Sequence, residues 1–237
     1  MTALPNPPVL CGTATAKGYE RWAPLYDGEA NPLLAREERH LSPLLGDVRK
    51  KSVLDLACGT GRWLEKLAMQ GPRSCAGVDC SAAMLKVARC KHPIRGKLVR
   101  GTCESLPFAS RMFDLAICSF ALGHFENLEK FAIEVCRVTK RGGDIFITDL
   151  HPSAYEHGWR VGFRDETGVA VEIETFPRGP DEIAEAFLSH GMKPMKSDSL
   201  WLEAPEQPIF ANAGKADRFG SASQLPAVIF FHFRQTK

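Results

Sequence analysis

The sequence has no long hydrophobic run and no excess of charge of either sign. It contains 30 Lys and Arg residues and 28 Asp and Glu residues, a net charge of +2. A nucleic-acid-binding protein usually shows a basic stripe, and none is present here. No apolar stretch approaches the ~20 residues of a membrane span, and residues 1–16 lack the basic start of a secretory signal. These absences predict a cytoplasmic protein with neither nucleic acid nor membrane as a partner.

Paired cysteine motifs are also missing. The chain has 8 cysteines, but no Cys-x-x-Cys pair, which excludes a zinc ribbon and a thioredoxin-type site. Several of them, such as Cys118, lie in apolar runs, so we expect small, buried, reduced thiols. A chain of 237 residues with 44% hydrophobic content can form a large core without a metal. No metal site is therefore expected.

The sequence does contain short apolar runs that alternate with helical patterns. The apolar runs are 52–57, 75–79, 97–101, 113–120 and 143–149. The helical patterns are 62–69, 82–90 and 128–138, preceded by two helical pieces within 17–46. This alternation predicts βαβ units and a parallel sheet. Toward the C-terminus, we expect a helix near 181–189, a strand near 192–202 and a final β-rich run at 227–234.

A glycine-rich turn follows the first predicted strand, with the pattern Asp55-x-Ala57-x-Gly59-x-Gly61. Glycine lets a backbone turn sharply and approach a ligand closely, and the N-terminus of the following helix offers free N–H groups to an anion. A dinucleotide-binding turn needs Gly-x-Gly-x-x-Gly directly after the strand. Counted from Gly59, the third glycine position is Leu64, so the spacing disfavours NAD.

This turn resembles the first motif of class I S-adenosylmethionine-dependent methyltransferases, which usually has Gly at the position of Ala57. Asp79 ends the second predicted strand 20 residues after Gly59, where an acidic side chain can bind both ribose hydroxyls. Residues 101–108 resemble the stretch whose first acidic residue contacts adenine, with Thr102 in its place. The resemblance covers about residues 19–150, and the sequence is similar to the small-molecule methyltransferases of the ubiquinone and menaquinone biosynthesis type.

The resemblance implies S-adenosylmethionine as the cofactor, S-adenosylhomocysteine as the product and a small-molecule acceptor methylated at oxygen or nitrogen. Tyr19 and Trp22 resemble the N-terminal helix that many small-molecule members fold over the cofactor, although an aromatic stripe packed on the core is an equal alternative. The cofactor-binding residues that we expect are Tyr19, Trp22, Asp55, Ala57, Gly59, Gly61, Asp79, Cys80, Met84, Cys103, Glu104 and Ser119.

The fold implied by this resemblance is an α/β, Rossmann-like, seven-stranded and mostly parallel sheet of order 3-2-1-4-5-7-6, with helices on both faces. We expect one domain over 1–237. Residues 1–46 would form an N-terminal arm and helical lid, 47–150 the cofactor-binding core, and 151–237 the substrate-side cover and last strands. Nothing in the sequence fixes the oligomeric state.

Two histidines follow predicted strands and are candidate catalytic bases, His124 and His151. We prefer His151, because Asp149 in the same turn is placed to orient its ring, although a lone histidine is more often structural. The segment 155–164 mixes aromatic and basic residues and is expected to cover a planar acceptor, including an anionic one, with a plain surface hairpin as the alternative. C-methylation, an NAD-dependent oxidoreductase and a non-catalytic cofactor-binding subunit remain alternative functions.

Overall fold

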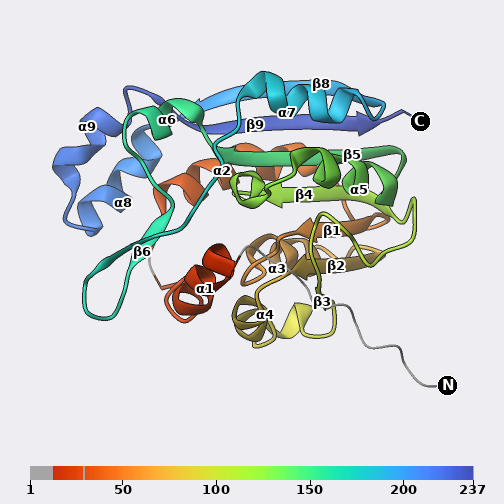
Figure 1. Ribbon diagram of the computed structural model, residues 1–237, viewed down its shortest axis with the longest axis horizontal. Helices are drawn as coiled ribbons and strands as arrows, with labels where there is room; N and C mark the ends of the chain where they lie inside the picture. Colours follow the sequence, from red (N-terminus) through yellow and green to blue (C-terminus); the bar gives the residue numbers. More distant parts are fainter. Residues whose placement is uncertain (1–12, 29, 237) are drawn as a thin grey trace.

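The computed structural model describes residues 13–28 and 30–236, and its centre is a seven-stranded sheet (Figure 1). The strand order is β3-β2-β1-β4-β5-β9-β8. With the separate two-stranded ribbon β6–β7 set aside, this is the expected order 3-2-1-4-5-7-6. The parallel strands are β1 (Ser52–Leu56), β2 (Ser74–Asp79), β3 (Leu98–Arg100), β4 (Phe113–Ser119) and β5 (Thr139–Leu150). The antiparallel ones are β8 (Met192–Trp201) and β9 (Pro226–Gln235).

Helices cover both faces of the sheet because alternate residues of each strand point to opposite sides. On β4, Leu115 and Ile117 pack on the side of α2 (Pro32–Leu45) and α3 (Arg62–Met69). Ala116 and Cys118 pack on the other side, against α5 (Leu128–Val138) and α7 (Pro180–Leu188). Figure 1 shows α5 and α7 in front of the strands and α2 behind them. The strands therefore read as continuous apolar runs, since both of their faces are buried.

The predicted elements within the core agree with the structure to within a few residues. α3 and α5 have the bounds that the helical patterns give, and α4 spans Ala82–Ala88. Asn31 accepts a hydrogen bond from Leu33 N and caps α2, whose first residue is Pro32, as expected for a helix start. The N-terminal helix α1 (Thr13–Trp22) starts earlier than the predicted 17, and residues 1–12 of the predicted arm lie outside the described residues.

The sequence pattern predicts only some of the helices and strands after residue 150. It contains α6 (Pro152–Glu156), the ribbon strands β6 (Gly162–Arg164) and β7 (Ala170–Glu172), α8 (Gln207–Asn212) and α9 (Phe219–Ala222). The short helices α8 and α9 add Phe210, Phe219 and Ala222 to the core on the α2 side of the sheet. These elements are too short to show a periodic pattern, because a helix of one or two turns offers few positions to its apolar face.

The cysteines only partly match the expectation of buried, reduced thiols. Cys58, Cys103, Cys118 and Cys136 are buried free thiols, and Cys90 is a free but exposed one. Cys80 is disulfide-bonded, which corrects the expectation that every thiol is reduced. No helix among residues 13–28 and 30–236 is long and apolar enough to cross a membrane. The same residues contain no group of three or more side chains suited to hold a metal ion.

Candidate functional site

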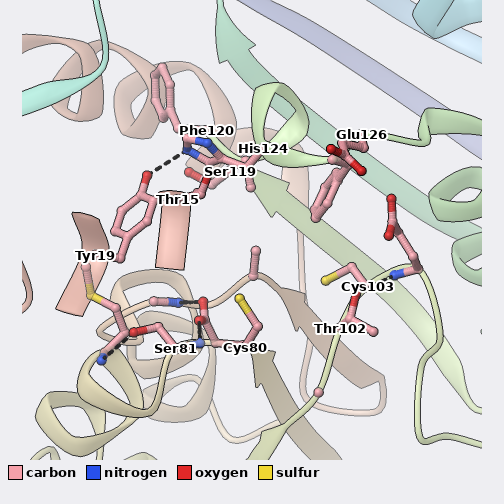
Figure 2. A pocket seen from close by; sticks show the side chains of 18 of the residues that line it. Thr15, Tyr19, Cys80, Ser81, Thr102, Cys103, Ser119, Phe120, His124 and Glu126 are labelled. Carbon is pink, nitrogen blue, oxygen red and sulfur yellow. Dashed lines mark hydrogen bonds between the residues drawn. The ribbon is translucent and has the colours of Figure 1, made fainter. Parts of the chain in front are cut away.

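The main cavity lies at the carboxyl ends of the parallel strands, where the strand order reverses between β1 and β4. Open α/β sheets bind their ligands at this point. The cavity has a volume of about 1090 Å³ with its open mouth included. Figure 2 shows Tyr19 and Glu126 on opposite sides of it, with Ser119, Phe120 and His124 between them along one wall and Cys80 and Ser81 on the facing wall.

The structure brings together ten of the fourteen predicted site residues around this cavity. They come from α1, from the turns after β1, β2 and β3, and from the end of β4. These ten are Tyr19, Ala57, Gly59, Asp79, Cys80, Met84, Cys103, Glu104, Ser119 and His124. The other four, Trp22, Asp55, Gly61 and His151, do not line it.

The glycine-rich turn uses left-handed backbone at three of its residues. Ala57, Gly59 and Gly61 have φ values of 50°, 53° and 82°. A Cβ atom on Gly61 would lie 2.3 Å from Ile94 Cδ1, whereas one on Gly59 would meet nothing within 4 Å. Gly61 is therefore required for helix packing, and Gly59 leaves open space at the wall of the cavity. Ala57 adopts a conformation that its side chain disfavours.

Asp79 joins the turn after β2 to the glycine-rich turn. Its Oδ2 accepts a hydrogen bond from Gly59 N at 2.8 Å, and its Oδ1 accepts one from Ser81 N at 2.7 Å. Burial raises the pKa of this carboxyl, while these backbone bonds oppose the shift. The N-cap of α4 is Ser81, which accepts from Met84 N. Asp79 is therefore a wall of the cavity that also orders the turn, and it is not a helix cap.

Asp55 lies behind the turn instead of in the main cavity. Its Oδ2 accepts from Leu64 N at 2.9 Å and so ties β1 to α3. Burial raises the pKa of Asp55 to about 7. The residue lines a second, smaller cavity of about 350 Å³, which it shares with Ala57, Arg62 and Ser119. The two cavities adjoin through Ala57, Gly59 and Ser119, which line both.

An ion pair between Arg62, which lines the second cavity, and the buried Glu37 lies next to that cavity. Arg62 donates to Glu37, which is fully buried, and also to Ser119 Oγ at 3.0 Å. Glu37 also accepts from Thr148 Oγ1 at 2.5 Å and from Trp63 Nε1 at 3.2 Å. These donors satisfy the buried carboxylate, whose burial without hydrogen bonds would cost free energy. No local pattern indicated a role for Glu37, because its partners lie in two distant segments, at residues 62–63 and at Thr148.

The opposite end of the cavity is formed by the loop after β3. Thr102 and Cys103 line it, and Glu104 Oε1 accepts from Asn127 N at 3.0 Å. That bond brings residues 125–127 next to the loop, and Phe125 and Glu126 complete this end of the cavity. Figure 2 shows Glu126 on the same side as Thr102 and Cys103.

The helix α1 closes the cavity from the side. Tyr19 Oη and His124 Nε2 are 2.7 Å apart, and their rings meet edge to face. Burial lowers the pKa of His124 to about 4, so its ring is neutral at pH 7. Trp22 turns outward and stacks on Phe163 of the ribbon with ring centroids 5.2 Å apart. We therefore correct its expected role, since Trp22 holds the helix in place without lining the cavity.

The preferred base, His151, lies away from the cavity. Its Nδ1 accepts from Ser153 N and caps α6, and its Nε2 lies 3.2 Å from Ser199 Oγ. Asp149 does not orient it, because the two oxygens of Asp149 accept from Gly123 N and Leu150 N. The alternation along the extended chain suggested a shared face, but the turn into α6 separates the two side chains.

Several lining residues were not among the expected ones. They share an aromatic or acidic character and are Tyr26, Phe120, Phe125, Glu126, Glu174 and Phe176, together with Thr15. Tyr26 continues the aromatic pattern of Tyr19 and Trp22. The sequence therefore indicated this residue, although it is not among the cofactor-binding residues that we expected. Glu174 and Phe176 follow the ribbon, in a segment without periodicity, and only the fold brings them to the cavity. The basic residues of segment 155–164 do not line it.

Comparison with known proteins shows that part of the chain is similar to methyltransferases. A family profile described as "Methyltransferase domain" matches residues 54–147. A phthiotriol/phenolphthiotriol dimycocerosates methyltransferase of Mycobacterium leprae is 34% identical over 115 residues, 48% of this chain and 43% of that protein. A demethylmenaquinone methyltransferase of Renibacterium salmoninarum is 34% identical over 140 residues, 57% of this chain and 58% of that protein. The chain thus spans about half the length of these curated relatives.

Solved structures show that the likeness in fold extends over most of the chain. A putative S-adenosylmethionine-dependent methyltransferase from Listeria monocytogenes superposes with a TM-score of 0.68 at 19% identity, covering 86% of this chain and 100% of that one. A putative methyltransferase in complex with the Trm112 activator of Haloferax volcanii gives 0.69 at 18% identity, covering 94% and 98%. The domain match, the strand order and the glycine-rich turn agree: residues 54–147 resemble a methyltransferase domain, and the chain has the fold of the S-adenosylmethionine-dependent methyltransferases.

Proposed function

We propose that this protein binds S-adenosylmethionine in the main cavity and transfers its methyl group to the oxygen or nitrogen of a small molecule. The observation that carries the proposal is the meeting of Gly59 and Asp79 at the switch point of the sheet, at 2.8 Å. When bound, the cofactor would supply a methyl group on a sulfonium sulfur, so that a bond from the acceptor lone pair to the methyl carbon forms as the carbon–sulfur bond breaks and the sulfur leaves as the neutral thioether S-adenosylhomocysteine. The other roles, which are binding the cofactor, positioning the acceptor and excluding water, belong to side chains of this protein.

The cavity fits this cofactor in shape. The open space beside Gly59 would receive the amino-acid end of the cofactor, and Asp79 would accept from its ribose hydroxyls with lone pairs that its two backbone bonds leave free. Met84 and Cys103 would flank the base. Thr102 lacks the charge usual for an adenine contact, and Glu126 on the same side of the cavity would accept from the base amine instead.

The charges of the cavity also fit the cofactor. Among the described residues that line it are the acidic residues Asp79, Glu104, Glu126 and Glu174, and no Lys or Arg. S-adenosylmethionine carries a net positive charge, which such a lining favours. NAD would bring two negative phosphates to the same place, so the electrostatics oppose the oxidoreductase alternative, as the glycine spacing does.

Tyr19 and His124 define where the acceptor would lie. They are hydrogen-bonded to each other on the wall formed by Ser119 and Phe120 at the end of β4. A general base works best with a pKa near the working pH, and that of His124 is lowered to about 4. We therefore assign the pair to positioning the acceptor and excluding water, with rate enhancement coming mainly from proximity.

Two alternatives remain within this proposal. C-methylation would use the same cavity, and the relatives include a demethylmenaquinone methyltransferase. The protein could also act as a cofactor-binding partner of another subunit, or need an activator, since one structural neighbour was solved with the Trm112 activator. Turnover by the purified chain alone would exclude both an obligatory activator and a non-catalytic role.

A calorimetric titration tests the proposal directly. We expect S-adenosylhomocysteine to bind with a Kd on the order of micromolar, about −8 kcal/mol, and NAD to bind far more weakly under the same conditions. Methyl transfer is then followed with labelled S-adenosylmethionine and a panel of hydroxyl, amine and carbon acceptors. Equal or tighter binding of NAD would refute the cofactor assignment.

A further inference from the structure

We propose that the acceptor is a flat molecule carrying a basic amine, recognised by Glu174 and by the aromatic side chains around it. This inference rests on the proposed function, because it concerns the part of the cavity that the cofactor would leave free. Sequence reasoning from the basic residues of segment 155–164 had allowed for an anionic acceptor. The arrangement of charges around the cavity favours the opposite charge.

The free part of the cavity is enclosed by three segments. Tyr19 of α1 forms one side, and Phe120 and His124 at the end of β4 form the next. The segment after β7 forms the third and is fixed by Phe176 N, which donates to Gly123 O at 2.6 Å. This bond brings Glu174 and Phe176 to the same cavity as Tyr19 and His124.

The walls of this region are aromatic. Tyr19, Phe120 and Phe176 line it, and Tyr19 is held by its bond to His124. Phe120 has a φ of 50°, a costly conformation for a bulky residue that tends to occur at functional sites. Aromatic faces carry negative electrostatic potential and attract cations within ~6 Å of the ring centre. Flat apolar molecules also stack on them.

Glu174 adds a formal charge that no described residue neutralises. Its carboxylate makes no hydrogen bond or ion pair with any residue in 13–28 and 30–236. The basic residues of neighbouring segments are engaged elsewhere. Arg178 donates to Phe125 O and to Glu182, and its guanidinium also lies over the Phe176 ring, 6.0 Å from the centroid. Arg160 donates to Tyr155 O and Trp159 O and pairs with Glu172 at 3.5 Å. Arg21 pairs with Asp165.

These features act in the same direction. A positively charged amine gains from the faces of Tyr19 and Phe120 and from Glu174, while a carboxylate or phosphate would meet negative potential and no Lys or Arg among the described residues that line the cavity. Since Glu174 is exposed, its attraction is screened by water and salt. Much of the recognition therefore comes from the aromatic walls, and Glu174 sets the preference for charge.

The test uses three matched probes that cannot be confused with the cofactor, namely benzyltrimethylammonium, benzyl alcohol and benzoate. Each is titrated calorimetrically into protein saturated with S-adenosylhomocysteine. We expect the cation to bind about 3- to 30-fold more tightly than the alcohol, the range of cation–π attraction, and benzoate to bind most weakly. Glu174→Gln should reduce the preference for the cation over the alcohol by at least about 2-fold, the scale of an exposed ion pair.

Glu172→Gln is the matched control, because Glu172 is exposed on β7 and does not line the cavity. It should leave all three affinities unchanged. Benzoate binding as tightly as the cation, an unchanged preference in Glu174→Gln, or no binding of the cation at millimolar concentration would each overturn the inference. These outcomes differ from failure of the proposed function, in which S-adenosylhomocysteine itself does not bind, and which would overturn this inference as well.

Discussion

Ala57 shows how one residue can carry strain into a binding site. Its φ of 50° lies in the region that costs an L-residue roughly 1–2 kcal/mol. Ala57→Gly removes this strain but adds freedom to the unfolded chain, so we expect a net gain of roughly 0.5 kcal/mol or more in the free energy of unfolding. Urea denaturation measures it. Affinity for S-adenosylhomocysteine should stay equal or rise, since the turn gains room.

Arg111→Gly is the control for this prediction. Arg111 is exposed and has a φ of 58°, so the strain is similar but far from the ligand. The Arg111→Gly variant should have a higher free energy of unfolding and an unchanged affinity for S-adenosylhomocysteine. A loss of stability in Ala57→Gly would show that the alanine methyl group contributes more through packing than its backbone costs.

Asp79 is predicted to act on folding as well as on binding. Asp79→Ala leaves Gly59 N and Ser81 N without their acceptors, and unsatisfied buried donors cost about 1–3 kcal/mol. We therefore expect a lower melting temperature without ligand and weaker binding of S-adenosylhomocysteine.

Asp114→Ala separates the two effects of Asp79→Ala. Asp114 also accepts a backbone bond, from Ser52 N at 2.7 Å, but it lies at the start of β4, away from the cavity. It should lower stability and leave the cofactor Kd at its original value. If Asp79→Ala behaves in the same way, Asp79 is a structural residue alone.

At the scale of elements, α1 is held by side-chain contacts with three other parts of the molecule. Trp22 stacks on Phe163 of β6, Tyr19 bonds to His124, and Thr60 Oγ1 donates to Asp27 just beyond the helix at 2.8 Å. A helix of 10 residues is marginal by itself, so these contacts determine whether it covers the cavity.

Trp22→Ala is predicted to loosen this cover. We expect faster hydrogen exchange over residues 13–22 and a several-fold higher Kd for S-adenosylhomocysteine, because the closed helix would be less populated. Hydrogen exchange with mass spectrometry and calorimetry measure the two effects. Trp201→Ala on the edge strand β8, 44% exposed, serves as the control and should change neither. Unchanged exchange in Trp22→Ala would show that the other contacts suffice.

At the scale of the whole molecule, buried groups set how stability depends on pH, and they act in opposite directions. The pKa of His124 is lowered from 6.5 to about 4. Between these values the unfolded chain binds a proton that the folded chain does not, so stability falls as pH falls. The pKa of Asp149 is raised from 3.8 to about 6 by burial. Its folded form binds the additional proton in that window, so stability rises as pH falls.

His124→Gln isolates the histidine part of this profile, since glutamine cannot titrate but can still bond to Tyr19. Between pH 6.5 and pH 4, the free energy of unfolding of the wild type should fall by up to ~3 kcal/mol relative to that of this variant, at 1.36 kcal/mol for each unit of pKa shift. Urea denaturation at a series of pH values measures the difference. His157→Gln, at an exposed histidine, is the control and should follow the wild type. A constant difference would contradict the lowered pKa.

The strands and helices of the core could be predicted from local sequence patterns. The apolar runs of β1 and β4 are buried along almost their whole length, so their pattern is strong and local. Of the helices between the strands, α4 and α5 begin at the side-chain caps Ser81 and Asn127. The glycine-rich turn and Asp79 were also readable, because left-handed backbone and a charge at the end of a strand depend on a few adjacent residues.

The residues around the proposed acceptor could be identified only from the tertiary structure. Glu174 and Phe176 reach the cavity because Phe176 bonds to Gly123, 53 residues earlier in the chain, and no local pattern records such a contact. His124 and His151 each follow a predicted strand, and the nearby Asp149 made His151 the preferred base. The turn into α6 carries His151 away, while Tyr19 holds His124 at the wall. Contacts between distant segments place these side chains, and such contacts leave no periodic trace in the sequence.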